Sequence, residues 1–193
     1  MKVNVEPYNP EWPLKFRKVQ ERLQGILQNV PVITIEHVGS TSIPLLRAKP
    51  VLDIDIIVKP SALEAARTAL ASAGYTDCGE MGVPGRFAFR QPGYGLLDFA
   101  HGLTINGELR QNTYVILEGC TALRNHLDIK RVLTENENLR EEYARFKADL
   151  AERDFGNIDE YCIAKTEVLC KILRIAGWSE EELEPVIRAN MNV

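Results

Sequence analysis

The sequence predicts an α/β (α+β) fold in which helices flank a mixed β-sheet and the C-terminal half of the chain is helical. Strands are indicated by residues 51–58, VLDIDIIV, where apolar residues occupy every even position, because strand side chains alternate between two faces. Helices are indicated after Cys120 by three capping signatures. A chain of 193 residues can bury one substantial core. We therefore expect a single domain over 1–193, with a sheet and active-site cleft in 1–119 and a helical part in 120–193.

The first elements are expected to be a helix, two strands and a second helix. Asn9 can cap a helix that begins near Pro10, and the apolar stripe of that helix is Phe16, Val19, Leu23, Ile26 and Leu27. Strands follow at 32–38 and 51–58. Ser61-Ala-Leu-Glu64 has the pattern of a capping box that opens a helix closing at Gly74.

The middle of the chain is rich in glycine and predicts short strands at 86–90, 95–100 and 112–118, with Asn106-Gly107 as a hairpin turn. The helical part has three predicted starts, at Thr134, Asn157 and Ser179, each with a glutamate three residues later. Gly177 is a natural helix end. These elements complete the expected sheet and the helical C-terminal half.

Composition excludes several classes of protein. The net charge of −4 argues against broad non-specific binding to DNA or other nucleic acid. No apolar run approaches the length of a membrane span, and the N-terminus lacks the apolar core of a signal peptide, so we expect a cytoplasmic location and no membrane partner. The four cysteines show no C-x-x-C spacing, which makes a zinc site or disulfide framework an unfavourable interpretation.

The segment 39–57, GSTSIPLLRAKPVLDIDII, carries the strongest chemical signal. Asp53 and Asp55 occupy odd positions of the strand and must share one face. Adjacent carboxylates are costly unless a cation lies beside them, either a divalent metal ion or a guanidinium. The Gly39-Ser40 turn can bring backbone N–H groups and a hydroxyl to a phosphate. This pattern indicates a site for a metal and a triphosphate.

Several stretches of the chain resemble the GrpB family: VEPYNPEWPLKF near the N-terminus, IEHVGSTSIP, AKPVLDI and GVPGRFAFR. The similarity covers nearly the whole chain. The resemblance implies a nucleotidyltransferase-like fold, in which two or three carboxylates hold magnesium against a triphosphate. It also implies a second activity, because fungal relatives in natural-product pathways act as arginine-containing cyclodipeptide synthases, which condense amino acids delivered on tRNA. The resemblance therefore implies the fold more directly than the reaction.

Two features depart from the family pattern. Asn112 and Tyr114 stand where histidines are usual, so a role for those histidines does not carry over. A longer connection, 91–110, adds Asp98 in an apolar run. Asp98 is either the third carboxylate of a catalytic and metal-binding triad with Asp53 and Asp55, or a loop acid.

Further candidates for substrate binding surround this segment. Ser40 is also a candidate nucleophile, although the only nearby base is His37, which we interpret as structural. Arg86 and Arg90 share a strand face and can hold a phosphate or carboxylate by bidentate contacts, unless they line a solvated strand. Tyr114 can stack on a base or aromatic substrate, or pack in the core. The predicted substrate-binding set is Gly39, Ser40, Thr41, Ser42, Arg47, Lys49, Arg86, Arg90 and Tyr114.

Three functions fit these residues. The first is magnesium-dependent nucleotidyl transfer from ATP or another NTP, with Asp53, Asp55 and Asp98 as metal ligands. The second is tRNA-dependent synthesis of an arginine-containing cyclodipeptide without a cofactor, with aminoacyl-tRNA, including arginyl-tRNA, as substrate and the acids gripping a guanidinium. The third is a ligand-binding domain without activity. We favour the second, because the departures from the family pattern separate this chain from the ordinary bacterial form.

Transfer RNA would need a basic surface on this acidic protein. The N-terminal helix carries Lys15, Arg17, Lys18 and Arg22, and the helix after Cys120 carries Arg124, Lys130 and Arg131. The hypothesis is that these groups border one cleft and contact phosphates.

Overall fold

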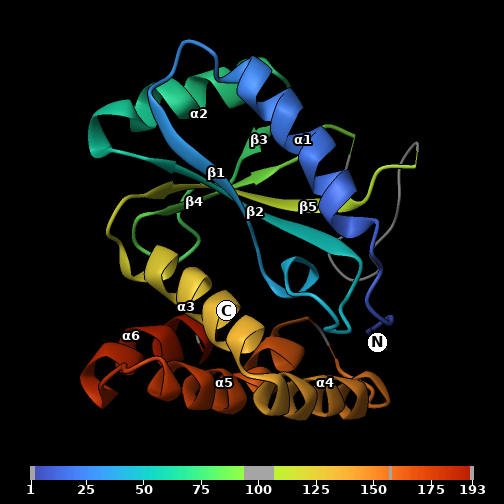
Figure 1. Ribbon diagram of the computed structural model, residues 1–193. Helices are drawn as coiled ribbons and strands as arrows, with labels where there is room; N and C mark the ends of the chain where they lie inside the picture. The colour runs from blue at the N-terminus through green and yellow to red at the C-terminus, as the bar shows by residue number, and fades with distance from the viewer. Residues whose placement is uncertain (1–2, 94–106, 157, 192–193) are drawn as a thin grey trace.

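The computed structural model describes residues 3–93, 107–156 and 158–191 (Figure 1). Within these residues the helices are α1 (Trp12–Ile26), α2 (Leu63–Ser72), α3 (Thr121–Glu135), α4 (Glu137–Ala151), α5 (Ile158–Ile175) and α6 (Glu180–Met191). The strands are β1 (Val32–Val38), β2 (Val51–Val58), β3 (Thr76–Asp77), β4 (Arg86–Arg90) and β5 (Arg110–Leu117). Two short 3-10 helices are η1 (Ser40–Ser42) and η2 (Pro60–Ala62).

The strands form one mixed sheet in the order β1-β2-β5-β4-β3. Only β2 and β5 run parallel, and the other neighbouring pairs are antiparallel. The predicted mixed α/β fold is confirmed, as are the bounds of β1, β2 and β4. The strand β5 begins two residues before its predicted start at 112. The predicted strand at 95–100 and Asn106 of the predicted hairpin lie outside the described residues.

The two faces of the sheet differ in polarity. The even positions of β2 form the main core with buried side chains of α1 and α2, including Leu23, Ile54 and Leu70. The apolar stripe predicted for α1 is confirmed, since Val19, Leu23 and Leu27 belong to this core. The odd positions of β2 place Asp53 and Asp55 on the other face, towards α3. We call the face that carries these two acids the polar face.

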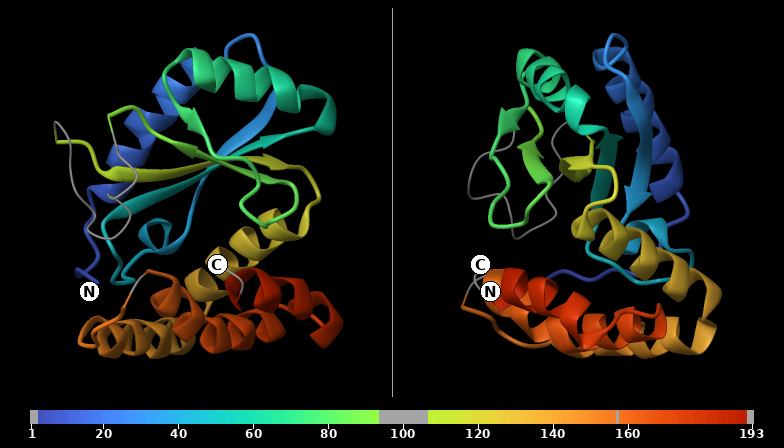
Figure 2. Two further views of the ribbon diagram at one scale, coloured as in Figure 1. Left: turned by 180° about the vertical axis from the view of Figure 1, so that it is seen from behind. Right: turned by 90° about the vertical axis from the view of Figure 1, so that its left-hand side faces the viewer.

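The helices α4, α5 and α6 lie together at the end of the molecule opposite α2, and α3 leads to them from the sheet (Figures 1 and 2). Their core includes Ile43 and Leu46, which follow η1, together with residues of α3, α4 and α5. The connection between η1 and β2 is therefore anchored in the helical part of the chain. None of the helices in the described residues has the length and hydropathy needed to cross a membrane.

Helix ends show where local patterns succeed and fail. The capping box at Ser179 is confirmed, because its hydroxyl accepts from the N–H of Glu182 while Glu182 accepts from the N–H of Ser179. The start predicted at Thr134 is wrong, because α3 continues through Thr134 and the cap of α4 is Asn136. The capping box at Ser61 is also wrong, since Ser61 lies in η2 and α2 has no side-chain cap. Asn157 lies outside the described residues.

Candidate active site

The polar face carries three columns of functional side chains. The acids Asp53 and Asp55 lie on β2, Asn112 and Tyr114 lie beside them on β5, and Arg86 and Arg90 lie on β4. In register, Asp53 pairs with Asn112, which pairs with Arg90, whereas Asp55 pairs with Tyr114, which pairs with Ala88. Neighbouring strands are about 4.8 Å apart, so the acidic and basic columns are separated by roughly 10 Å. The sheet register thus brings five of the predicted site residues, Asp53, Asp55, Arg86, Arg90 and Tyr114, onto one surface.

Gly39 is fitted directly against Asp53. Its φ is +68°, a conformation that favours glycine. A Cβ atom at this position would lie 2.1 Å from Asp53 Oδ2 and 2.7 Å from its Cγ. Any side chain larger than hydrogen would therefore collide with the carboxylate. The turn and the first acid therefore form one geometric unit.

The three residues of η1 have different roles. The Thr41 hydroxyl is buried, donates to the carbonyl of Val51 at 2.9 Å and accepts from His37 Nε2 at 3.0 Å. The Thr41 side chain is therefore used within the fold, and a role for its backbone N–H in substrate binding stays a prediction. Ser42 Oγ donates to the carbonyl of Gly39 at 2.6 Å. The Ser40 hydroxyl has no hydrogen-bond partner in the part of the chain that the structure describes, so no base is in place to activate it as a nucleophile.

His37 has the structural role that the sequence indicated. Its ring stacks on Phe16 with the centroids 4.6 Å apart. Burial and then the charge of Lys130 lower the pKa of His37 to about 4, so the ring is neutral near pH 7. Because Thr41 donates to a carbonyl, the neutral ring must donate from Nε2. His37 fixes the turn through Thr41 and does not act on Ser40.

Asp55 is fully buried and does not line an open cleft. Its Oδ2 accepts from Nδ1 of His126 on α3 at 2.8 Å. Its Oδ1 is also buried and has no hydrogen-bond partner among the described residues. A buried carboxylate oxygen without a partner is costly. This oxygen is therefore suited to a cation that binds beside the acid.

Asp53 is half-buried, and its Oδ1 accepts from the Asn112 side-chain amide at 2.8 Å. Burial raises the pKa of Asp53 above its ordinary value, and the repulsion of Asp55 adds to the rise. The hydrogen bond from Asn112 and the nearby His126 and Lys165 oppose it. In balance, the neutral form of Asp53 is more favourable here than it is in water. A cation bound beside the carboxylate would offset the cost of its buried negative charge.

Two lysines of the helical part lie near Asp53. Lys165 on α5 interacts electrostatically with Asp53. Lys147 on α4 is buried and donates to the carbonyl of Arg47 at 2.7 Å. Burial, followed by repulsion from Lys165, lowers the pKa of Lys147 well below its ordinary value. Both lysines were missed in the sequence, although Lys147 occupies the apolar stripe of Tyr143 and Leu150, where a charged residue is unusual.

The remaining predicted residues are divided between this surface and other places. Arg47 contributes its carbonyl to Lys147, and Lys49 is half-buried in the connection before β2. Asp98 lies outside the described residues, so its role as a third carboxylate stays a prediction. Among the residues that are described, no group of three or more histidine, cysteine or acidic side chains is arranged to hold a metal ion.

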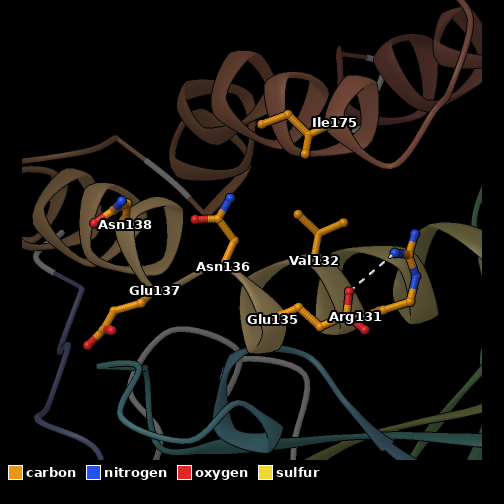
Figure 3. Close-up of a pocket in the computed structure, with 7 residues that line it drawn as sticks. All are labelled: Arg131, Val132, Glu135, Asn136, Glu137, Asn138 and Ile175. Carbon is orange, nitrogen blue, oxygen red and sulfur yellow. Dashed lines mark ion pairs between the residues drawn. The ribbon is translucent and has the colours of Figure 1, made fainter.

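A separate pocket of about 450 Å³ lies where α3 meets α4. Figure 3 shows Val132 and Asn136 on one side of it and Ile175 on the other, with Arg131 and Glu135 paired along α3. It contains none of the predicted site residues. Its charged side chains are already paired or point outwards in Figure 3, so we place the candidate chemistry on the polar face.

Comparison with known proteins fixes the family. The profile of the family described as GrpB protein matches residues 2–174. The chain belongs to the GrpB family. The UPF0157 protein BH1888 of Halalkalibacterium halodurans is 31% identical over 176 residues, which cover 91% of this chain and 83% of that relative. The UPF0157 protein YqkA of Bacillus subtilis is 30% identical over 86% of this chain, and the match spans 45% of that relative's length.

The fold agrees with this membership. The crystal structure of the conserved protein GrpB from Enterococcus faecalis has a TM-score of 0.72 and 25% identity, over 95% of this chain and 99% of that chain. A looser likeness, with a TM-score of 0.43 and 12% identity over 74% of this chain, is to the Cid1 poly (U) polymerase, and a likeness of that size says nothing about activity. None of the names of the GrpB relatives states an activity, so the reaction must be argued from the site.

Proposed function

We propose that this GrpB protein is a magnesium-dependent nucleotidyltransferase that binds a nucleoside triphosphate over Asp53 and Asp55. The observation that carries the proposal is the buried Oδ1 of Asp55, which has no partner among the described residues, beside an acid whose pKa is raised by burial. Two such carboxylates on one strand face need a cation. The fixed turn at Gly39 adjoins them and presents backbone groups next to the place where a triphosphate would carry that cation.

The choice between a metal ion and a guanidinium follows from which carboxylate oxygens of Asp53 and Asp55 already accept a hydrogen bond. A guanidinium binds best to both oxygens of one carboxylate. Here Asp53 Oδ1 is taken by Asn112 and Asp55 Oδ2 by His126, so neither acid offers its full edge. A metal ion can take one oxygen from each acid. Mg²⁺ in particular is commonly held by one or two carboxylates with waters and substrate phosphates completing its shell.

The residues present therefore fit one magnesium ion that arrives with a nucleotide, held by Asp53 and Asp55. When bound, the ion would neutralise charge on the triphosphate and on the departing pyrophosphate. Asn112 holds Asp53 in orientation, and His126 does the same for Asp55. Lys165 supplies positive charge near the phosphates. The Gly39 turn keeps the nucleotide and the acids in one fixed geometry, which is the main contribution a protein makes to such a transfer.

The expected result of a binding experiment is that magnesium and nucleotide bind together. Isothermal titration of the protein with a non-hydrolysable ATP analogue should give saturable binding with magnesium and binding at least tenfold weaker in EDTA, because two acids alone repel a triphosphate. The control is Glu118→Gln, which removes an exposed acid beyond the end of β5. Equal affinity with and without magnesium would contradict the proposal.

A second function is favoured by one observation. Asn112 stands opposite Asp53, so β2 and β5 together present two carboxylates and an amide on the polar face, while the acid opposite Asp55 on β1, Glu36, lies beside Lys130. Two carboxylates with Lys165 nearby can be balanced by one further positive charge, which the guanidinium of an arginyl group can supply. This supports the arginine-containing cyclodipeptide synthase that the family resemblance implies.

The basic surface expected for tRNA is not assembled as the sequence suggested. The helix α1 packs on the apolar face of the sheet, opposite Asp53 and Asp55, and its Arg22 pairs with Glu108. On α3, Arg124 pairs with Glu182 and Arg131 with Asp128. The basic residues of α1 and those of α3 therefore do not share one face, and several of them already form ion pairs with acids.

The cyclodipeptide function has its own test. Purified protein is supplied with all amino acids, tRNA, synthetases and ATP, and new cyclic dipeptides are sought by mass spectrometry. A product that depends on arginine and persists when EDTA is added after the tRNA has been charged would support this function. If no cyclic dipeptide forms while the magnesium-dependent binding above is present, the nucleotidyl function alone remains.

A further inference from the structure

Arg86 is held at a fixed place on the polar face, and none of the described residues is an anionic partner for it. Its guanidinium carbon lies 4.7 Å from the centroid of the Tyr114 ring. The side chain is half-buried, and its Nε is fully buried without a hydrogen-bond partner among the described residues. Most of the other arginines that the structure describes pair with an acid. Arg86 is therefore a positioned cation with hydrogen-bonding capacity left over.

The neighbouring strand position gives a direct comparison. Phe87 follows Arg86 on β4 and points to the opposite face, where Arg67 stacks on it at 5.0 Å. Arg67 also binds Asp77 at 2.8 Å and Glu64 at 2.7 Å. Two arginines thus stack on aromatic rings on the two sides of one strand. Of Arg67 and Arg86, only Arg86 lacks an acid among the residues described. This points to a role for Arg86 in binding a ligand and not in holding the fold.

The surroundings define what can bind there. Tyr114 lies between Arg86 and Asp55 in the sheet, and Ala88 is the small residue opposite Tyr114 on β4. His126 is 5.9 Å from the Tyr114 ring. A flat group that contacts the exposed part of Tyr114 can therefore place an anionic end at Arg86. Its other end would point towards the acids, about 10 Å away by the strand spacing.

We propose that Arg86 and Tyr114 form a binding site for a carboxylate carried by the acceptor substrate. One guanidinium presents a planar edge that matches the two oxygens of a carboxylate. A phosphate group, with its greater charge, normally recruits more than one cation, and the other arginine of this strand face, Arg90, lies four residues further along β4, roughly 13 Å away by the rise of a strand. The acceptor is then an amphipathic or aromatic monocarboxylate whose attacking group reaches the nucleotide over Asp53 and Asp55. Its assignment as the acceptor rests on the proposed function, whereas the carboxylate site itself does not.

Three probes of one shape test the site without nucleotide or magnesium. Benzoate, benzamide and phenylphosphonate are titrated separately into the protein while the ¹⁵N signal of Arg86 Nε is followed by NMR, with the signal assigned from the Arg86→Lys variant. Benzoate should shift this signal to saturation, benzamide should leave it unchanged, and phenylphosphonate should bind more weakly than benzoate. Equal responses to benzoate and benzamide, or tighter binding of phenylphosphonate, would overturn the proposal.

Two variants complete the test. Arg86→Met should weaken benzoate binding by roughly tenfold or more, since it removes charge-assisted hydrogen bonds, and Arg86→Lys should recover only part because it keeps the charge without the planar fork. The matched control is Arg67→Met, which removes the other stacked arginine and should leave benzoate affinity unchanged. Unchanged affinity in Arg86→Met with a native NMR spectrum would also overturn the proposal. Since no nucleotide is present, failure here leaves the magnesium-dependent binding experiment unaffected, and failure there leaves this one unaffected.

Discussion

Asp53→Asn is expected to abolish nucleotidyl transfer while making the protein more stable. The Asp53 carboxylate is proposed to hold the metal, so its loss removes several kcal/mol of transition-state stabilisation. Because about 1.4 kcal/mol corresponds to a factor of ten, the rate should fall about a thousandfold. The amide retains an oxygen for the hydrogen bond from Asn112. The substitution also removes a negative charge that burial disfavours. The melting temperature should therefore rise by roughly 2–4 °C.

The stability gain has a pH dependence whose sign follows from the raised pKa of Asp53. A raised folded-state pKa means that the folded protein binds this proton more readily than the unfolded chain, so folding is favoured as the pH falls. The free energy of unfolding of Asp53→Asn should exceed that of the wild type most near neutral pH. Its advantage should disappear as the pH falls from the raised folded-state pKa of Asp53 towards the ordinary value of 3.8.

Urea unfolding at several pH values measures this difference, alongside turnover of labelled ATP. Asp77→Asn is the control, because Asp77 lies on the edge strand β3 and pairs with Arg67 away from the polar face. Turnover in Asp53→Asn close to that of the wild type would refute both enzymatic proposals. A loss of stability at neutral pH would show that the carboxylate is satisfied within the protein and needs no added cation.

Gly39→Ala should remove activity and destabilise the fold together. The added Cβ would lie 2.1 Å from Asp53 Oδ2 unless one of the two groups moved. The alanine would also have to keep a φ of +68°. The left-handed conformation costs about 1–2 kcal/mol, and displacing a packed group adds about 1–3 kcal/mol. Because the methyl group pushes on the acid itself, we expect turnover to fall at least a hundredfold even in the fraction that is folded.

Gly79→Ala is the matched control for this prediction. Gly79 has a φ of +69°, and a Cβ built there would meet nothing within 4 Å. It should therefore cost only the backbone strain of about 1–2 kcal/mol and leave turnover unchanged. If the two variants lose equal stability by urea unfolding and both keep full turnover, the close fit between Gly39 and Asp53 has no functional role.

The parts of the site that were predicted correctly depend on local periodicity. The alternation in β2 places Asp53 and Asp55 on one face, and the same rule places Arg86 and Arg90 together on β4. The strand bounds followed from the same pattern. These features need only neighbouring residues in the chain, which is why a single sequence contained them.

The parts that were missed depend on packing between distant elements. His126 lies 71 residues from Asp55, and no local pattern in the sequence places its helix over the sheet. Lys165 reaches Asp53 from α5 for the same reason. The buried hydroxyl of Thr41 was missed for another reason, because a 3-10 turn has no alternation with period two and the sequence could not show which hydroxyl points inwards. Thr134 failed because a second capping residue, Asn136, lies two positions later.

Lys130 donates to the carbonyl of His37 at 2.8 Å, and Lys147 donates to that of Arg47 at 2.7 Å. These carbonyls lie on the two sides of η1, so the turn is tied at both ends to helices encoded after residue 119. His126 comes from the same later part of the chain. Recombination between related genes at the boundary near residue 119 would thus separate the turn and the acids from the side chains that hold them in place. The first 119 residues and those that follow are expected to be inherited together.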